Sequence, residues 1–304
     1  MSILVIGSAA LDSVKTPFGN VKDALGGSSI YFSIAASFFS DVKLVAVVGS
    51  DFPKKYIEML AKRKIDTSGL EVAKGKTFRW QGEYNYDLNS AQTIDTQLNV
   101  FSSFKPVVPV ELKNTKFVFL ANIDPELQLN VLSQIKKPEL VGCDTMNYWI
   151  QTKPKALKKT LEFVDVLTIN ESEIRQFTGE NNLLKAAKKI FQIGPWAIVI
   201  KRGEYGALFV SKNELFSAPA YPLEDVFDPT GAGDSFAGGF MGYLAACSEI
   251  NKKEMRRAVI TGSVMASFNV EAFSVNRLIK LTNAEINKRY KQFKQLTHFE
   301  HLSR

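Results

Sequence analysis

The chain alternates short apolar runs with longer segments that have a helical period. Runs rich in Val, Ile and Leu occur at ILVIG, KLVAVVG, KFVFLA, ELVGCD, VDVLTIN, WAIVIK and GALFV. Nearly continuous apolar runs are typical of strands buried on both faces, and the helical segments between them would cover a parallel sheet. The pattern predicts an α/β fold with a mostly parallel central sheet. In such folds ligands bind at the carboxyl ends of the strands.

Residues 76–108 break this alternation, because aromatic and polar residues alternate there without a helical period. The pattern predicts antiparallel strands inserted as a lid, in which Arg79, Tyr84 and Tyr86 would close over a substrate or act as packing residues. The alternative is an edge hairpin without functional motion, since aromatic alternation is ordinary in sheets. An exposed apolar lid sheet could also pair two copies of the chain into a homodimer.

The composition is that of an ordinary soluble globular protein, with 304 residues of which 45% are hydrophobic and 23% charged. No stretch approaches the roughly 20 apolar residues that span a bilayer. The start MSILVIGSAAL lacks a basic leader and is typical of a buried first strand, so we expect a cytoplasmic protein without a membrane partner. Cys143 and Cys247 are too few for a disulfide framework and are expected to be packing residues.

The formal net charge of +7 raises the question of a nucleic-acid partner. Much of the Lys lies along helical patterns such as KPKALKKTLEFV, which favours solvated helix faces, so we expect no nucleic-acid binding. The C-terminal segment NKRYKQFKQLTHFEHLSR predicts a final amphipathic helix after Asn283 and is where a basic surface contact stays plausible. The charge could equally attract a phosphorylated substrate.

Several kinds of catalytic site are disfavoured by the residues that are missing. The histidines, His298 and His301, both lie at the extreme tail, which argues against a His-assisted nucleophile or a His-ligated metal. There is no Gly-x4-Gly-Lys-Ser/Thr sequence, and the first strand ends in GSAALD without the dinucleotide fingerprint. Any nucleotide must be bound in another way.

The segment VFDPTGAGDSFAGGFMGYLAA carries the strongest chemical signal. Pro229 fixes an entry turn, and a helix of small residues follows, so the N–H groups of Gly231, Ala232 and Gly233 could bind an anion such as a transferring phosphoryl group. Asp234 could then accept a proton from an alcohol that attacks this anion. The alternative is that Asp234 caps the helix and that GAG is only a tight turn.

The stretch DPTGAGDSFAGGF resembles, along its whole length, the second signature of the PfkB/ribokinase family of carbohydrate kinases. The segments GSAALDSV, LGGSSIYFSIAAS and VVGSDFP are similar to the family as well. The resemblance implies one ribokinase-like three-layer α/β/α domain over residues 1–304, with a small inserted β lid from about residues 12–25 and 76–108. It also implies ATP and Mg²⁺, often with activation by K⁺, and Asp234 as catalytic base beside the anion hole of Gly231, Ala232 and Gly233.

Two further segments match nucleotide-binding parts of the family. Asn170 and Glu173 have the spacing of a capping box, and in the family a similar pair orders magnesium-bound water and phosphate. The segment VIKRGEYGALFV predicts a strand, a Gly-bearing turn and a strand. The resemblance implies that Lys201, Gly203 and Gly206 lie along the phosphates and ribose of ATP, although a plain hairpin is the alternative.

Asp228 and Thr230 match family positions beside the anion hole that contribute to a monovalent-cation loop. Their simpler role is turn formation.

The acceptor side is predicted from residues near the first strand. Asp12 matches a family carboxylate that binds substrate hydroxyls, and a surface turn is its alternative role. Gly26 and Gly27 correspond to the substrate-contacting glycine pair. Ribose-specific relatives carry Lys and Asn shortly after this pair, whereas this chain has Ser28 and Tyr31, which argues against ribose. Residues after two further strands, namely Asn122, Asp124, Asp144 and Asn147, would line the acceptor pocket or cap the following helices.

The sequence therefore predicts ATP-dependent phosphoryl transfer to a hydroxyl group of a small sugar or sugar-like acceptor. Two alternatives are a nucleoside kinase of the same family and a noncatalytic ligand-binding protein on a kinase-like fold. The sequence leaves the acceptor open among sugar, nucleoside and sugar phosphate, because specificity depends on the shape of the pocket.

Overall fold

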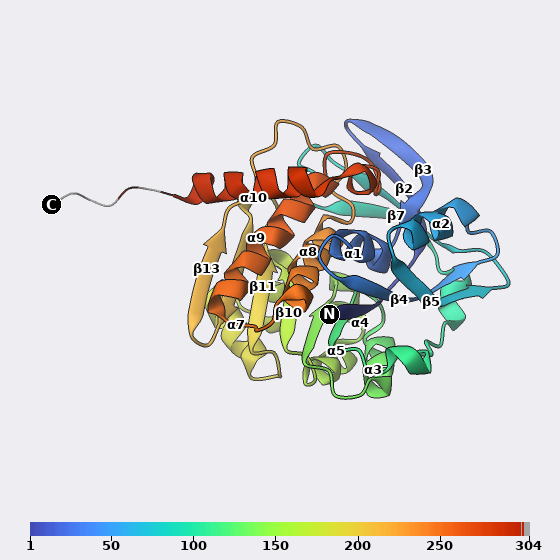
Figure 1. Cartoon of the computed structure of the whole chain (residues 1–304), viewed down its shortest axis with the longest axis horizontal. Helices are drawn as coiled ribbons and strands as arrows, with labels where there is room; N and C mark the ends of the chain where they lie inside the picture. Colours follow the sequence, from blue (N-terminus) through green and yellow to red (C-terminus); the bar gives the residue numbers. More distant parts are fainter. Residues whose placement is uncertain (299, 301–304) are drawn as a thin grey trace.

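The computed structural model describes residues 1–298 and 300. Within this part of the chain a nine-stranded sheet has the order β13-β12-β11-β10-β9-β8-β1-β4-β5 (Figure 1). The strands from β5 to β11 are parallel to their neighbours, and β12 and β13 add an antiparallel edge. The strands are β1 (Ser2–Ile6), β4 (Asp41–Gly49), β5 (Ile65–Ala73), β8 (Phe117–Leu120), β9 (Leu140–Asp144), β10 (Val166–Asn170), β11 (Ala197–Lys201), β12 (Ala207–Ser211) and β13 (Glu214–Ala218).

Helices cover both faces of this sheet, so that two hydrophobic clusters form. One face packs against α1 (Ser28–Ala36), α2 (Lys54–Lys62), α8 (Ala232–Ala246), α9 (Lys252–Asn269) and α10 (Asn283–Thr297). The other packs against α3 (Pro125–Gln134), α4 (Asn147–Thr152), α5 (Pro154–Leu161), α6 (Glu171–Thr178) and α7 (Leu183–Phe191). The predicted layers, the seven predicted strands and the C-terminal helix are confirmed.

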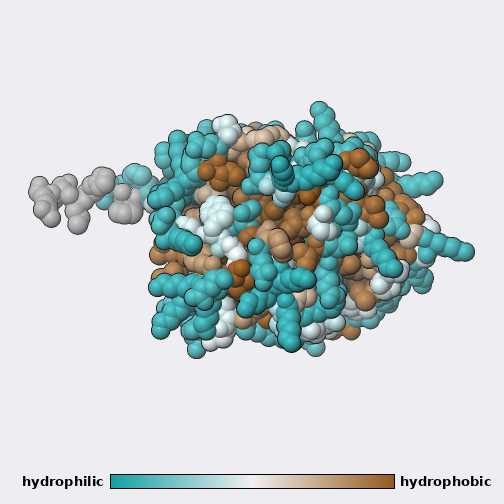
Figure 2. All heavy atoms as spheres, turned by 90° about the horizontal axis from the view of Figure 1, so that it is seen from below, coloured by the Kyte–Doolittle hydropathy of each residue, from teal (hydrophilic) through white to brown (hydrophobic). Residues whose placement is uncertain are grey.

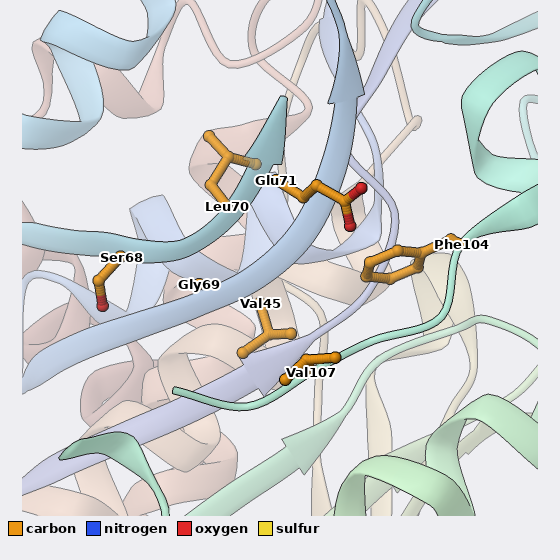
Figure 3. Close-up of a pocket in the computed structure, with 7 residues that line it drawn as sticks. All are labelled: Val45, Ser68, Gly69, Leu70, Glu71, Phe104 and Val107. Carbon is orange, nitrogen blue, oxygen red and sulfur yellow. The ribbon is translucent and has the colours of Figure 1, made fainter. Parts of the chain in front are cut away.

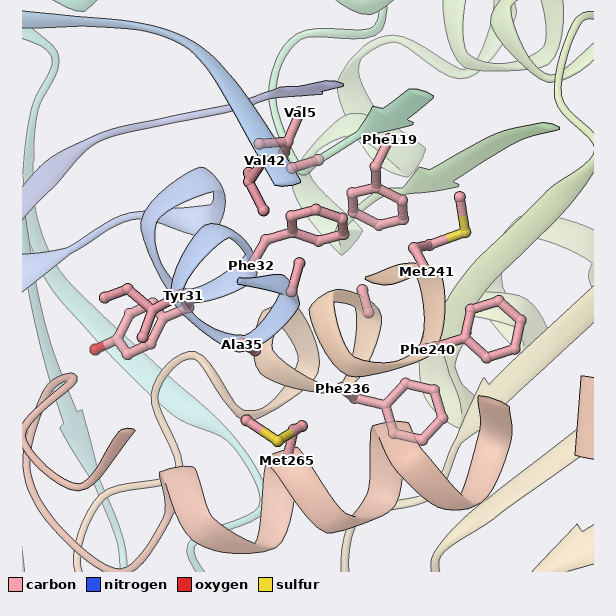
Figure 4. Packing of buried hydrophobic residues seen from close by; sticks show 14 of the residues in the cluster. Val5, Tyr31, Phe32, Ala35, Val42, Phe119, Phe236, Phe240, Met241 and Met265 are labelled. Atoms are coloured by element: carbon pink, nitrogen blue, oxygen red, sulfur yellow. The ribbon is translucent and has the colours of Figure 1, made fainter. Parts of the chain in front are cut away.

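Figure 4 shows how the first cluster joins the sheet to its helices. Phe32 of α1 stacks on Phe119 of β8 with 4.4 Å between ring centroids. Phe240 and Met241 of α8 are fully buried in the same cluster. Because α1 and α8 pack tightly together, the segments at their N-terminal ends are held side by side.

A second sheet has the strand order β3-β2-β6-β7 and lies at the upper right of Figure 1. Its strands are β2 (Ala10–Thr16), β3 (Gly19–Gly26), β6 (Phe78–Tyr84) and β7 (Ala91–Gln97). These are the two segments predicted to form a lid, but the second segment ends earlier than predicted. A short 3-10 helix, η1 (Asn99–Ser103), follows, and Val100, Phe104 and Val108 are buried in the core beneath the main sheet. The apolar residues after Gln97 therefore anchor the segment to the body.

The surface carries apolar patches and a cavity. Hydrophilic side chains frame apolar patches on the face shown in Figure 2. A cavity of about 180 Å³ lies between edge strand β5 and the segment that carries Phe104 and Val107 (Figure 3). None of the residues predicted to act in catalysis or binding lines it.

Among the described residues, no helix has the length and apolar character needed to cross a membrane.

The chain changes direction across the sheet at β1. From β1 it proceeds to β4 and β5 on one side, and β8 then returns to the other side of β1. Open α/β sheets bind ligands at such a switch point. The residues after β1 and β8 do meet here, because the N–H of Ala121 donates to the carbonyl of Ile6, and the Ser28 hydroxyl donates to the carbonyl of Asn122.

Candidate active site

The turn before α8 brings the predicted anion hole to the N-terminus of a buried helix. Gly231 occupies the cap position with φ of 76°, a left-handed conformation that favours glycine. A β-carbon at this position would also lie 2.4 Å from ring atoms of Tyr31. Gly231 therefore holds the cap, and the alternative interpretation of Asp234 as the N-cap is wrong.

One of the three predicted donors is already used within the turn. The N–H of Ala232 donates to the carbonyl of Pro229 at 3.1 Å, because the turn closes as an i to i+3 bond. The prediction of a free donor at Ala232 is therefore wrong. Among the described residues, no acceptor is found for the N–H groups of Gly231 and Gly233. These two groups remain available to an anion at the helix N-terminus.

A buried ion pair lies beside this turn. The Lys201 ammonium is 2.7 Å from Oδ2 of Asp144, and both side chains are largely buried. A β-carbon at Gly233 would lie 3.0 Å from Nζ of Lys201, so the ammonium borders the anion hole. Burial alone would lower the pKa of Lys201, but Asp144 and Glu173 outweigh it and the pKa stands above its ordinary value. Lys201 is therefore a stable cation next to the two free N–H groups.

Asp234 is partly buried in the first turn of α8, and its pKa is raised. Burial raises its pKa to about 7, Asp144 and Glu173 contribute in the same direction, and Lys201 opposes them. A carboxylate with this pKa is matched to proton transfer near neutral pH.

Asn170 and Glu173 form the predicted capping box at the start of α6. The N–H of Glu173 donates to Oδ1 of Asn170 at 2.8 Å, and the N–H of Asn170 donates to Oε2 of Glu173 at 2.9 Å. Burial raises the pKa of Glu173 to about 7, although Lys201 opposes the rise. Among the described residues no hydrogen-bond partner is found for its second oxygen, so a water or metal ligand could use it.

The hairpin of β11 and β12 has the predicted strand, turn and strand. Gly203 and Gly206 bound the 3-10 turn η3 (Gly203–Tyr205), and the N–H of Arg202 donates to the carbonyl of Gly206 at 2.8 Å. Arg202 itself pairs with Glu171 at the start of α6. The hairpin is thus tied to the helix that carries the capping box.

Asp12 defines the opposite side of the site. It is 5% exposed on β2, and a β-carbon at Gly26 would lie 1.9 Å from its Oδ2, so the glycine leaves room for the carboxylate. Burial raises its pKa to about 7. The N–H of Gly27 opposes this rise, and the charges of Asp228 and Asp234 add to it. Asp12 and Asp234 are therefore near enough to interact.

Asp228 and Thr230 connect the anion-hole turn to the lid and to the loop after α9. Asp228 is fully buried, and its two oxygens accept the N–H groups of Thr230 and Ser274 at 2.9 and 3.0 Å. The hydroxyl of Thr230 lies 3.3 Å from that of Tyr84 on lid strand β6. Asn269 donates to the carbonyl of Thr230 at 2.8 Å. The predicted turn role of Asp228 is confirmed.

The comparisons with known proteins agree with this geometry. The model of the pfkB family carbohydrate kinases matches residues 5–280. The chain belongs to this family. It is 30% identical to a cytidine kinase of Thermococcus kodakarensis over 79% of this chain and 87% of the relative. It is 28% identical to a nucleoside kinase of Methanocaldococcus jannaschii over 89% of this chain and 90% of the relative.

The solved structures extend the likeness to the whole fold. The structure of a putative ribokinase II from E. coli in complex with ATP and Mg²⁺ superimposes with a TM-score of 0.79 at 18% identity, covering 96% of this chain and 99% of the other. The family model and the relatives confirm the predicted family and the kinase activity, and the solved structures confirm the ribokinase-like fold.

Three of the predicted acceptor-side residues lie elsewhere in this pfkB-family kinase. Asp124 caps α3 through the N–H of Glu126 at 2.9 Å and pairs with Lys153 at 2.6 Å. Asn147 is exposed, and its side-chain oxygen accepts from the N–H of Tyr148 at 2.9 Å. Asp144 instead joins Lys201 beside the anion hole. The backbone carbonyl of Asn122 accepts a hydrogen bond from the Ser28 hydroxyl at the start of α1. The side-chain oxygen of Asn122 accepts from Trp149 Nε1 at 3.0 Å.

The lid side chains singled out from the sequence also separate. Tyr84 points into the site, whereas Arg79 pairs with Asp23 and Asp51, and Tyr86 is 88% exposed. The sequence used Tyr31 only as an argument against ribose as the acceptor. It gave no sign that the ring of Tyr31 contacts Gly231.

Proposed function

We propose that Asp234 is the catalytic base of a kinase that phosphorylates a hydroxyl group of a sugar or nucleoside. The observation that carries the proposal is that Asp234 lies in the first turn of α8, directly after Gly231 and Gly233, whose N–H groups have no acceptor among the described residues. Lys201 borders Gly233, and both Lys201 and Asp12 are close enough to Asp234 for their charges to interact. A phosphoryl group on the first side and an alcohol on the second would meet at this carboxylate.

In the proposed reaction Asp234 accepts the proton of the acceptor hydroxyl. At the same time the oxygen of that hydroxyl forms a bond to the γ-phosphorus of ATP. The bond between this phosphorus and the bridging oxygen breaks, and ADP leaves with the electron pair. The N–H groups of Gly231 and Gly233 and the Lys201 ammonium stabilise the charge on the transferring group. Ala232 contributes through its bond to Pro229, which holds the turn.

Mg²⁺ would neutralise charge on the phosphates, and it usually retains water molecules between itself and protein carboxylates. Glu173 fits this role, since one of its oxygens caps α6 and the other is directed to no protein donor among the described residues. Asn170 would support it from the cap. Gly203 and Gly206 would let the backbone of the hairpin approach the nucleotide.

Asp12 would accept hydrogen bonds from two neighbouring hydroxyls of the acceptor, while Gly26 and Gly27 leave space beside it. The two relatives named as a cytidine kinase and a nucleoside kinase favour a nucleoside among the acceptors. The second sheet would act as the lid that excludes competing water.

Three further expectations stay predictions. Asp228 and Thr230 would flank a K⁺ site, which comparing turnover in potassium and in tetramethylammonium salts would test. The exposed side of the lid sheet would join two copies of the chain, which the mass in solution would test. That residues 1–304 form a single domain is likewise a prediction.

A panel of sugars, nucleosides and sugar phosphates assayed for ADP release tests the function. We expect Mg·ATP-dependent turnover of at least one member by the wild type and its loss in Asp234→Asn. Asp41→Asn is the matched control, because Asp41 is exposed at the amino end of β4. Acceptor binding without ADP release would indicate a noncatalytic binding protein and refute the proposal.

A further inference from the structure

The Tyr31 hydroxyl is a buried polar group for which no partner is found among the described residues. Tyr31 lies in α1 and is 1% exposed, and its hydroxyl oxygen is shielded from solvent and makes no hydrogen bond within that part of the chain. Figure 4 shows the residue at the margin of the core, with this oxygen directed away from the cluster. A buried hydroxyl without a partner destabilises the folded protein, so such groups call for an explanation.

The surroundings of Tyr31 place its hydroxyl in the acceptor half of the site. Its ring packs on Gly231 of the anion-hole turn. Burial raises its pKa well above the ordinary value, and the nearby groups that add to this rise are Asp12, Asp228, Tyr84 and Asp234.

The acceptor half has acidic groups and no cation to balance them. Besides burial, the charges of Asp228 and Asp234 raise the pKa of Asp12, and those of Asp12, Asp228 and Asp234 raise the pKa of Tyr84. Burial raises the pKa of Asp228, and no Lys or Arg among the described residues contributes to the pKa of any of the three. Arg79, on the neighbouring lid strand, is held by Asp23 and Asp51. The cation of the site, Lys201, lies beside Gly233 and pairs with Asp144.

The site is therefore divided by charge. The half with Lys201 and the free N–H groups suits the phosphates of ATP, and the half with Tyr31 and Asp12 suits hydroxyl groups. An acceptor that carried its own phosphate would bring a second anion next to carboxylates without a counter-ion, and repulsion between these like charges at short range would weaken its binding.

We propose that the acceptor site selects an uncharged polyol over its phosphorylated form, and that the Tyr31 hydroxyl is a specificity-determining group that hydrogen-bonds an acceptor oxygen. Asp12 and Tyr84 come from the lid strands β2 and β6, so outward movement of that sheet would open this half to the acceptor. The inference rests on the proposed kinase function and narrows its substrate class.

Selection against a phosphorylated acceptor is tested with matched acceptor pairs. For the best uncharged acceptor in the panel, kcat/KM is compared with that of its monophosphate in which the reacting hydroxyl is left free, and the shift in Tm produced by each is measured. We expect kcat/KM for the monophosphate to be lower by roughly 100-fold or more, and no Tm shift with it. Equal or better use of the monophosphate overturns the inference while the kinase function stands.

The role of Tyr31 is tested with Tyr31→Phe, which removes only the hydroxyl. We expect KM for the uncharged acceptor to rise about fivefold to tenfold with kcat within about threefold of wild type, because the lost bond is made to the bound acceptor. Without acceptor, Tm should rise by about 2–4 °C, since an unpaired polar group has been removed. Tyr290→Phe in α10 is the matched control, as Tyr290 packs against the core away from the site residues.

The outcomes distinguish failure of the role of Tyr31 from failure of the proposed kinase function. An unchanged acceptor KM in Tyr31→Phe overturns the role of Tyr31 and would indicate a buried water as the partner of the hydroxyl. If no panel member is phosphorylated, the proposed function fails. The inference then stands only if the uncharged acceptor raises Tm in the wild type and raises it less in Tyr31→Phe.

Discussion

Asp234→Asn changes one oxygen to an amide nitrogen and should separate catalysis from stability. Loss of the base should lower kcat by about 10²- to 10⁴-fold, the usual contribution of general base catalysis. Asparagine cannot take up the proton, yet it has nearly the shape of aspartate and leaves Lys201 paired with Asp144.

Asp234→Asn should lower activity but raise the free energy of unfolding at neutral and alkaline pH. Because burial raises the pKa of Asp234 from 3.8 to about 7, the folded state binds its proton more tightly than the unfolded chain does. The free energy of unfolding therefore falls as pH rises from about 4 to about 7 and stays low above it. The pKa change corresponds to at most about 4 kcal/mol. Solvent at the partly exposed carboxylate reduces this, and we expect Asp234→Asn to be more stable than wild type by about 1–3 kcal/mol at pH 8.

The assay is urea unfolding of wild type and Asp234→Asn at a series of pH values, beside ADP release for the best acceptor. The stability gain should grow between about pH 4 and pH 7, the window set by the ordinary and the raised pKa. Asp41→Asn should show neither effect. Near-wild-type turnover in Asp234→Asn would refute its role as base, and lower stability than wild type at pH 8 would refute the account of its pKa.

Three other predictions concern the same half of the site. The wild-type kcat/KM should decline as pH falls below about 7, since Asp234 must be ionised to accept a proton and its pKa is raised to about 7; a flat profile from pH 6 to pH 8 would contradict this. Lys201→Met should lower kcat by about 10²-fold or more and cost about 3–5 kcal/mol in urea unfolding, because Asp144 is left buried without its partner; unchanged stability would contradict the buried pair. Gly231→Ala should lower both Tm and kcat, because alanine is strained at φ of 76° and its β-carbon would overlap the Tyr31 ring; wild-type values of both would show that the turn is not constrained.

Much of the fold could be predicted from local sequence patterns. Strands such as Ala197–Lys201 were predictable because they are buried on both faces and are apolar along their length. The turn at Gly231 and the capping box of Asn170 and Glu173 were predictable because both depend on residues within a few positions of one another. The prediction failed within the same turn at Ala232, whose N–H bonds to Pro229, because residue types do not show whether a turn closes its own hydrogen bond.

The sequence by itself determined the layered α/β fold, the helix that begins after the Gly-rich turn, and the place of the Asp234 carboxylate, the proposed base, in the first turn of that helix. Only the tertiary structure decided which distant residues surround that base. Asp144 and Lys201 pair because β9 and β11 both flank β10 and end at the same edge of the sheet. Tyr31 reaches Gly231 because α1 packs on α8. Strand order and helix packing join residues far apart in the chain, and local patterns carry no record of those contacts.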